Sequence, residues 1–488
     1  MQADASKQPR QPTLLQSFIP IILLVIALAS SVYLFGDSSS YGPNQIALWI
    51  AAAVAVLIGF YNRYTWEMIE DGIRHGVSVA LGAMLIILAV GSLIGTWMLS
   101  GTVPTMIYYG LELISPSFFY AATAVICGIV ALSIGSSWTT AATIGIALMG
   151  IAGGLDLSLP ITAGAVVSGA YFGDKMSPLS DTTNLAPAVA GNELFAHIRY
   201  MGYTTLPAFV IALVVFLILG FQDNTATDIV KLEELQLHLS NSYEISWIML
   251  IPLFVLLGLA AKKKPALPTV FFGAILGAVW ALIFQPEVVA QMADGNTGVV
   301  DQIKVAWLAL TSGFTIETAS PELNSLLNRG GMESMMNTIW LIISAMSFGA
   351  IMERLGYLER LFMGVLKMVR STGSLITATL FTCFGANVLT ADQYMAIVIP
   401  GRIFRGEYER RNIDSRVLSR TLEDSGTLTS ALIPWNTCGV FMFSTLAVSP
   451  LEYAPYAVFN WLVPLIAIVY AYTGYKILSI DENQAETA

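Results

Sequence analysis

The residues Leu179-Ser180-Asp181-Thr182-Thr183-Asn184 place a carboxylate, an amide and several hydroxyls within an otherwise apolar part of the chain. A second polar stretch, Leu422-Glu423-Asp424-Ser425-Gly426-Thr427, resembles the first and, like it, runs on to a proline. Asp181 and Asp424 lie 243 positions apart in a chain of 488 residues, so each half contains one of them. Carboxylates are costly within a bilayer and are kept there mainly where they pair, coordinate ions or relay protons. We therefore expect both stretches to serve a function at membrane depth.

The composition supports a membrane setting. Apolar residues make up 56% of the chain, charged residues only 11%, and the mean hydropathy is +0.70. A soluble domain has about 25% charged residues, so this chain lacks the polar surface to face water on all sides. The sequence predicts an all-α polytopic membrane protein with roughly 10–14 transmembrane segments.

Plain spans are expected where about 20 apolar residues follow one another, which is enough to cross a core of roughly 30 Å. They fall near 14–35, 44–61, 77–98, 201–221, 245–261, 266–285, 336–353 and 455–478. Short loops rich in Lys and Arg are cytoplasmic, and the strongest such marker is the arginine-rich stretch 402–420, which includes Arg420. Both termini are then cytoplasmic, whereas the acidic region 222–244 is external.

These boundaries divide the chain into two membrane halves. We expect a cytoplasmic tail at 1–13, a first half at 14–221, a connecting region with two spans at 222–335, a second half at 336–478 and a tail at 479–488. The arginine-rich stretch precedes Asp424, whereas the region before Asp181 is mostly apolar, so the halves are predicted to be inverted repeats.

Each half contains segments that cannot be plain spans. No charge occurs between Glu112 and Asp156, and a helix of that length would be about twice the bilayer thickness. We expect interruptions near 135–140 and 173–187 in the first half, and near 385–392 and 423–437 in the second. Each half would then contain a re-entrant hairpin or a discontinuous helix. Such matched interruptions indicate the binding site of an ion-coupled transporter.

The interruptions offer hard oxygen ligands for a small alkali cation. Ser136 and Ser137 in one half, with Asn387 and Thr390 in the other, could supply neutral oxygens, and the C-terminal ends of half-helices favour the same charge. Asp181 and Asp424 would supply the carboxylates. A buried carboxylate can also hold a proton when no cation is bound, so Na⁺ and H⁺ would compete for one site.

Several of these residues have a purely structural alternative. Lys175 can take part in a proton relay with Asp174 or simply neutralise it. Asp392 is either a ligand or the cap of a half-helix. Small hydroxyl residues in membrane helices most often serve close packing, and the arginines of 402–420 are most simply a topology signal.

Four motifs resemble the NhaC family of Na⁺/H⁺ antiporters. They are Gly-Ser-Ser-Trp at 135–138, Gly-Asp-Lys-Met-Ser-Pro-Leu-Ser-Asp-Thr-Thr at 173–183, Glu-Asp-Ser-Gly-Thr at 423–427 and Ile-Pro-Trp-Asn-Thr-Cys-Gly at 433–439. The resemblance implies the ion-transporter superfamily fold, with two inverted repeats and, in some members, a dimer. Carried over to this chain, the motif acids are Asp174, Asp181 and Asp424, with neighbouring oxygens from Ser136, Thr182, Thr183, Ser425 and Thr427.

The same resemblance implies export of Na⁺ in exchange for H⁺ at a bacterial inner membrane, by alternating access, with lipid but no nucleic acid as a partner. No cofactor is expected beyond the transported ions, with Li⁺ as a further candidate. The nearest rival, also within the resemblance, is Na⁺- and H⁺-coupled exchange of malate and lactate. A channel would not need two matched carboxylates. An enzyme is disfavoured because the chain has no HExxH, GxSxG or His-rich motif.

Overall fold

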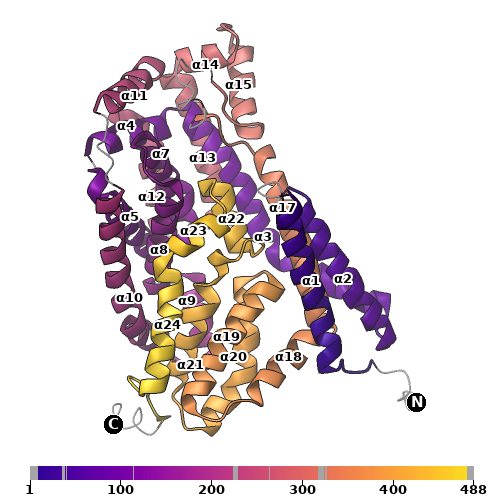
Figure 1. The fold of residues 1–488 in the computed structure, drawn as a ribbon. Helices are drawn as coiled ribbons and strands as arrows, with labels where there is room; N and C mark the ends of the chain where they lie inside the picture. The colour runs from indigo at the N-terminus through magenta and orange to yellow at the C-terminus, as the bar shows by residue number, and fades with distance from the viewer. Residues whose placement is uncertain are drawn as a thin grey trace.

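Figure 1 shows the computed structural model, which describes residues 9–480 apart from 36–38, 40, 114, 224–228, 263, 317–323 and 325–326. Within those residues every regular element is helical, and the only strand-like contact is an isolated bridge between Ile413 and Ser479. Most of the predicted tails, at 1–8 and 481–488, lie outside the described residues.

The helices of the first half and of the connecting region follow one another with short breaks. They are α1 (Leu14–Phe35), α2 (Pro43–Tyr61), α3 (Trp66–Leu99), α4 (Thr102–Leu113), α5 (Phe119–Ile134), α6 (Ser137–Thr140), α7 (Ile146–Gly154), α8 (Leu159–Met176), α9 (Asp181–Ala190), α10 (Leu194–Gln222), α11 (Ile229–Ser242), α12 (Ile251–Ala261), α13 (Ala266–Phe284), α14 (Pro286–Met292) and α15 (Val299–Thr311). A π-helical turn at Ala141–Gly145 joins α6 to α7.

The second half contains the remaining helices. They are α17 (Met336–Arg354), α18 (Tyr357–Leu366), α19 (Thr372–Thr390), α20 (Gln393–Arg410), α21 (Ser415–Leu422), α22 (Thr437–Leu446), α23 (Pro450–Tyr453) and α24 (Val458–Thr473). A π-helical turn at Glu423–Thr427 continues α21. Such turns are rare and occur frequently at functional sites.

Length and hydropathy confirm an all-α polytopic membrane protein. Among the described residues, eight helices are long and apolar enough to cross a membrane, or up to ten if each of two bent helix pairs forms one span. The predicted spans 14–35 and 336–353 correspond to α1 and α17. The helix in the predicted span 455–478 is shorter than that span, because α24 covers only Val458–Thr473. The helical segment before it, Pro450–Tyr456, makes an angle of 57° with α24.

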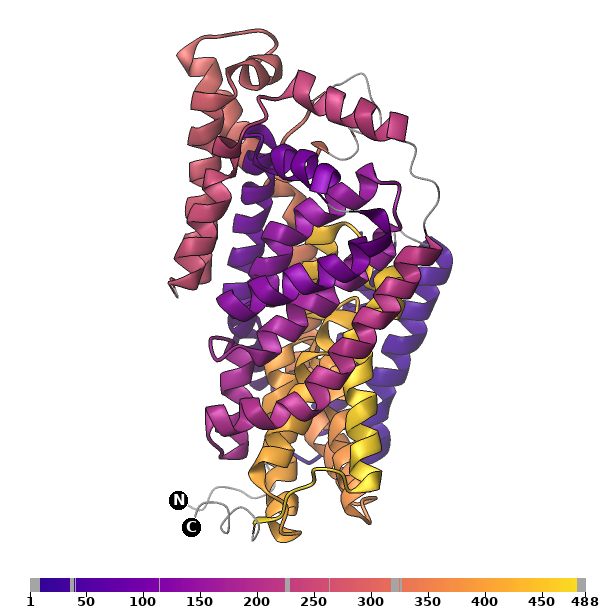
Figure 2. The same cartoon turned by 90° about the vertical axis from the view of Figure 1, so that its left-hand side faces the viewer.

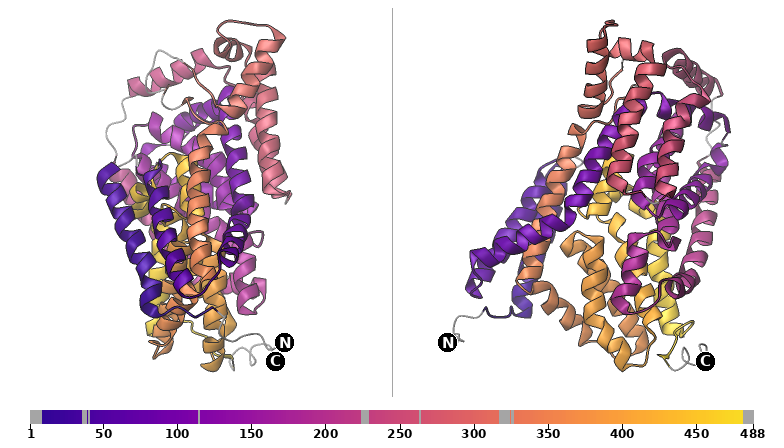
Figure 3. Two further views of the ribbon diagram at one scale, coloured as in Figure 1. Left: turned by 90° about the vertical axis from the view of Figure 1, so that its right-hand side faces the viewer. Right: turned by 180° about the vertical axis from the view of Figure 1, so that it is seen from behind.

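The two ends of the molecule differ in what they contain. At the lower end in Figures 1 and 2 lie the start of α1, the connection between α20 and α21 and the end of α24. There the Ile413–Ser479 bridge joins the arginine-rich stretch to the end of the described chain. Helices α11, α14 and α15 lie at the opposite end, away from α19–α21 (Figure 3). The basic and acidic connections thus lie at opposite ends of the molecule.

The breaks of the first half cross each other. Helix α5 ends at Gly135, which has φ +76°, and α8 and α9 are separated by residues 177–180. A Cβ at Gly135 would lie 2.5 Å from Leu179 Cβ and 2.9 Å from the Ser180 backbone nitrogen. Only glycine therefore fits this position, for both its backbone conformation and its contact.

The second half has corresponding breaks, one of them at the end of the predicted range 385–392. Helix α19 runs without interruption through 385–387 and ends at Thr390, so the break lies at Ala391 and Asp392. Ala391 takes a left-handed conformation with φ +57°, and its carbonyl accepts a hydrogen bond from Thr437 N at 2.9 Å. As in the first half, the two breaks contact each other.

The boundaries of the two halves follow a constant register of 256 positions. The same offset relates the left-handed residues Gly135 and Ala391, and Gly191 and Ala447. It also relates the N-cap pairs Ser136 and Asp392, Ser158 and Asp414, and Ser180 and Asn436. The chain therefore repeats one arrangement of helices and breaks.

This register shows that the similarity first noted between the two polar stretches is misaligned. Asp181 corresponds to Thr437, and Asp424 corresponds to Ser168. Asp181 begins the helix that follows a break, whereas Asp424 lies in a π-helical turn before one. The expectation that the two acids are equivalent was wrong, because the matching signal in each half is its break and not its acid.

Candidate functional site: a cavity between the helix breaks

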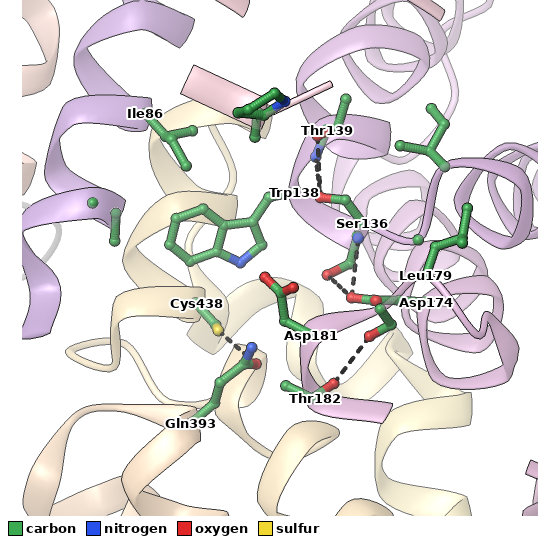
Figure 4. Close-up of a pocket in the computed structure, with 18 of the residues that line it drawn as sticks. Ile86, Ser136, Trp138, Thr139, Asp174, Leu179, Asp181, Thr182, Gln393 and Cys438 are labelled. Carbon is green, nitrogen blue, oxygen red and sulfur yellow. Dashed lines mark hydrogen bonds between the residues drawn. The ribbon is translucent and has the colours of Figure 1, made fainter. Parts of the chain in front are cut away.

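A cavity of about 660 Å³ lies where the breaks of both halves meet, and Figure 4 shows a close-up. Residues of α3 and of the α12–α13 connection complete its wall, including Lys264. The two halves also meet at this cavity through Trp138 and Phe441, whose rings stack with centroids 4.2 Å apart. The break residues that line it are Ser136, Ser137, Ser180, Asp181, Thr182, Asp392, Gln393, Tyr394, Thr437 and Cys438.

Asp181 is the acid most open to this cavity. It is the first residue of α9, directly after the cap residue Ser180, and its side chain is exposed. In Figure 4 its carboxylate lies between Trp138 and Thr182. The hydroxyl of Tyr394 donates to Asp181 Oδ2 at 3.5 Å. The carboxylate is therefore free to bind a ligand that enters the cavity.

Asp174 also reaches the cavity but is buried and held in place. Its Oδ2 accepts hydrogen bonds from the Ser137 backbone at 3.0 Å and from the Ser137 hydroxyl at 2.7 Å. These bonds join α8 to the start of α6, so they fix the break at Ser136 against the break after Met176. The predicted ion pair between Asp174 and Lys175 is absent, because Lys175 points to a different partner.

Lys175 pairs with Asp424 in the protein interior. Its Nζ lies 2.8 Å from Asp424 Oδ1, and both side chains are fully buried. The hydroxyl of Thr204 donates to the same oxygen at 3.1 Å, and Arg420 Nε lies 3.8 Å from the other carboxylate oxygen. Asp424 does not line the cavity, so the prediction that it meets Asp181 around one ion was wrong. A carboxylate that close to two cations is already neutralised.

Arg420 is also placed differently from the prediction. Instead of marking the cytoplasmic surface with the other arginines of 402–420, it is fully buried. Its guanidinium lies over the ring of Tyr200, 4.5 Å from the ring centroid. We name Lys175, Arg420, Glu423 and Asp424 the charged cluster.

Glu423 is the member of this cluster that sequence reasoning missed. It is fully buried, and its Oε1 accepts a hydrogen bond from Thr182 Oγ1 at 3.0 Å. Thr182 also lines the cavity, so one hydrogen bond separates Glu423 from the cavity wall. The signal was present in the sequence, because Glu423 directly precedes Asp424 in the same motif.

Two predicted oxygen donors of the second half serve the fold rather than the cavity. The Asn387 amide donates to the Gly426 carbonyl at 2.7 Å and to Thr429 Oγ1 at 3.0 Å, which ties α19 to the π-helical turn. Thr390 Oγ1 donates to the Ala386 carbonyl at 2.9 Å, in its own helix. Neither residue lines the cavity.

The other predicted hydroxyls also lie behind the cavity wall. Thr183 Oγ1 donates to the carbonyl of Lys175 at 3.0 Å and so closes the end of α8. Ser425 Oγ donates to the Leu380 carbonyl at 2.8 Å. Thr427 is buried in the same turn and does not line the cavity. The structure thus brings Ser136, Ser137, Asp174, Asp181, Thr182 and Asp392 together and places the rest outside.

Most of the helix ends that line the cavity are N-termini. The sequence had instead predicted that C-terminal ends of half-helices would face the bound cation. The first residues or caps of α6, α9, α20 and α22 all line it, and these are Ser136, Ser180, Asp392 and Thr437. Asp392 acts as the predicted cap, since its Oδ1 accepts from Met395 N at 3.0 Å. Helix N-termini favour negative charge, so they stabilise the ionised carboxylates here.

No group of three or more His, Cys, Asp or Glu side chains converges as a metal site anywhere in the described part of the chain. A cation in the cavity would therefore rely on one carboxylate and on neutral oxygens. Such ligands suit an alkali ion that binds and leaves, because weak sites release their ions readily.

Broken helices that meet around a carboxylate-lined cavity, in a chain of many spans, define a membrane transporter rather than an enzyme. The chain belongs to the Na⁺/H⁺ antiporter family, whose model matches residues 169–475. This membership confirms the NhaC-like resemblance of the motifs.

Three relatives illustrate the range of the family. The chain is 40% identical over 478 residues to a malate-2H⁺/Na⁺-lactate antiporter of Bacillus subtilis, with 98% of each chain covered. It is 38% identical over 433 residues to the Na⁺/H⁺ antiporter NhaC of Alkalihalophilus pseudofirmus, covering 89% of this chain and 91% of the relative. It is 37% identical over 490 residues to the arginine/ornithine antiporter ArcD of Halobacterium salinarum, covering 98% and 97%.

Proposed function

We propose that the protein exchanges Na⁺ for H⁺ across a bacterial inner membrane by alternating access, with the cation bound at Asp181. The observation that supports this most is the exposed carboxylate of Asp181 in a cavity to which the breaks of both repeats contribute. Relatives named as Na⁺/H⁺ antiporters align with nearly the whole chain.

The groups around Asp181 define the proposed cation-binding site. Its carboxylate supplies one charged ligand, and Ser136 and Thr182 supply neutral oxygens from the two breaks of the first half. Asp174 adds negative potential while its own oxygen stays bonded to Ser137. A small alkali cation that loses part of its water shell needs this mixture of charge and hard oxygens.

The orientation follows from the basic connections. Lys264 lies at the cavity wall, in a basic loop that the charge bias places in the cytoplasm. The arginine-rich end carries the last described residues of the chain. We infer that both termini are cytoplasmic, that the two repeats are inverted and that this conformation opens to the cytoplasm.

A second candidate, exchange of small organic anions such as malate and lactate, is favoured by the four helix N-termini at the cavity. Helix N-termini bind carboxylates, and Lys264 would add positive charge. The relative from Bacillus subtilis that is named for malate and lactate makes this candidate specific.

The deciding experiment is flux in proteoliposomes loaded with a pH-sensitive dye. We expect Na⁺, and Li⁺ to a lesser degree, to dissipate an imposed pH gradient without any organic acid. K⁺ serves as the matched control. Proton movement that requires malate or lactate would replace the first candidate with the second.

A further inference from the structure

A second group of candidate functional residues, the charged cluster, lies behind the cavity wall. In the described part of the chain, four acids around the breaks are buried against two buried Lys or Arg side chains, so not every acid has a compensating cation. The acids are Asp174, Asp392, Glu423 and Asp424, and the bases are Lys175 and Arg420. A buried acid without compensation binds a proton or a cation.

The contacts of these acids differ sharply. Asp424 has Lys175 at 2.8 Å, together with a hydrogen bond from Thr204. Asp174 receives two hydrogen bonds from Ser137, and Asp392 caps α20. Each of these three carboxylates therefore has an ion pair, two hydrogen bonds or a helix-capping role that compensates part of its charge.

Glu423 is the least satisfied of the four. Its Oε1 accepts one hydrogen bond, from Thr182, and its Oε2 is buried without an aligned donor. The acid lies within a π-helical turn, and its one donor, Thr182, comes from the first turn of α9. Among the buried acids it is the one whose charge costs the most, and a proton is the smallest species that removes that cost.

From these contacts we propose that Glu423 holds the exchanged proton, while the cation binds separately at Asp181. This inference rests on the proposed Na⁺/H⁺ exchange. The proton reaches Glu423 from the cavity through the hydroxyl of Thr182, which donates to Glu423 and lies 3.3 Å from Ser180 Oγ. Both hydroxyls line the cavity.

Arg420 and Tyr200 lie between Glu423 and a second cavity on the other side of the charged cluster. A second cavity of about 590 Å³ at the arginine-rich end is lined by Tyr200, whose ring covers Arg420. A guanidinium does not give up its proton, so Arg420 does not relay protons toward that cavity. The proposed proton route of Glu423 therefore runs to the cavity that also holds Asp181 and not through Arg420.

The groups that face Glu423 couple the two sites. They are Lys175 and Asp174 from α8, Thr182 from α9, Cys383 from α19 and Thr427 from its own turn, with Asp424 next to it in the sequence. A cation at Asp181 and a proton on Glu423 each remove one negative charge from this region. Occupation of one site therefore disfavours occupation of the other.

The test uses Glu423→Gln, which mimics the protonated side chain permanently. In proteoliposomes we expect the variant to lose Na⁺-driven proton movement, yet to exchange ²²Na⁺ for Na⁺ at saturating Na⁺. In the wild type that exchange should fall as pH is lowered, whereas in the variant it should not depend on pH. The inference would be overturned if Glu423→Gln still showed Na⁺-driven proton movement, or if its ²²Na⁺ exchange depended on pH as that of the wild type does.

If Glu423→Gln does not fold, two other variants test the same inference with the Glu423 carboxylate kept in place. Thr182→Val removes the hydrogen bond and the relaying hydroxyl but keeps the carboxylate. Na⁺-driven proton movement should therefore fall more than ²²Na⁺ exchange at saturating Na⁺, and the pH profile of that exchange should move upward because the carboxylate loses its donor. Ser425→Ala is the control, because the hydroxyl of Ser425 lies in the same turn as Glu423 but donates to the Leu380 carbonyl of α19 and not to the carboxylate. An unmoved profile in Thr182→Val would also contradict the inference.

The two levels of the proposal fail separately. If the wild-type protein shows no Na⁺-dependent proton movement, the proposed function is wrong. If the wild type shows it and Glu423→Gln behaves identically, only the assignment of Glu423 is wrong.

Discussion

Lys175 and Asp424 form a salt bridge of 2.8 Å in which both side chains are completely shielded from solvent. The pair links α8 of the first repeat to the π-helical turn of the second. Because Thr204 and Arg420 also contact Asp424, the pair belongs to a network rather than to an isolated bond. It holds the two broken helices together directly behind the cavity.

Removal of one partner from this salt bridge should destabilise the protein strongly. Lys175→Met leaves the Asp424 charge buried with only Arg420 near it, which should cost about 3–5 kcal/mol. We expect a marked fall in the midpoint of thermal unfolding in detergent, and partial recovery in the double variant with Asp424→Leu. The exposed pair of Arg354 and Asp71 is the control, since Arg354→Met should cost at most about 1 kcal/mol. Equal effects at both pairs would contradict the structural role of Lys175.

The two acids first singled out by the sequence should behave differently when neutralised. Asp181→Asn removes a charge that faces the cavity, so we expect loss of Na⁺-driven transport with little change in thermal stability. Asp424→Asn leaves Lys175 buried without its partner, so we expect a clear loss of stability. Unfolding midpoints and dye-based flux on both variants measure this contrast. Similar stability losses in the two variants would mean that the acids share one environment.

The two left-handed residues at the hairpin breaks should respond in opposite ways to exchange of glycine and alanine. Gly135→Ala adds a Cβ within 2.5 Å of Leu179 Cβ and a strain of about 1–2 kcal/mol at positive φ, so both stability and transport should fall. Ala391→Gly relieves strain of the same kind and should be tolerated or slightly stabilising. Thermal unfolding of both variants tests this. If Gly135→Ala left stability and transport unchanged, the backbone at residue 135 would not pack against Leu179 as closely as the structure indicates.

Accessibility of the cavity tests its orientation. The three native cysteines are buried, and we propose replacing them with alanine before introducing Leu179→Cys at the cavity wall. A membrane-impermeant maleimide should label this cysteine from the cytoplasmic side, which Lys264 marks. Ser168→Cys, at the buried position equivalent to Asp424, should stay unlabelled. Labelling of Leu179→Cys only from the external side would reverse the orientation.

Much of the fold could be predicted from the sequence, because the relevant signals are local. Apolar runs of span length define α1, α2 and α17, and small polar residues around Gly135 and Pro434 mark breaks that the structure contains. Within the predicted range 385–392 the break lies at the end, because Gly385 and Asn387 are compatible with a helix, whereas Asp392 caps the next one.

The sequence also identified the three acids that line the cavity, since a carboxylate inside an apolar segment is conspicuous whatever its partners. What it left open was which acid faces the cavity, which one is neutralised and which one was overlooked. Only the crossing of the helices decides that Lys175 reaches Asp424 instead of its neighbour Asp174, and that Thr182 meets Glu423. The physical reason is that composition fixes the cost of burying a charge, whereas the three-dimensional packing of distant segments determines what compensates it.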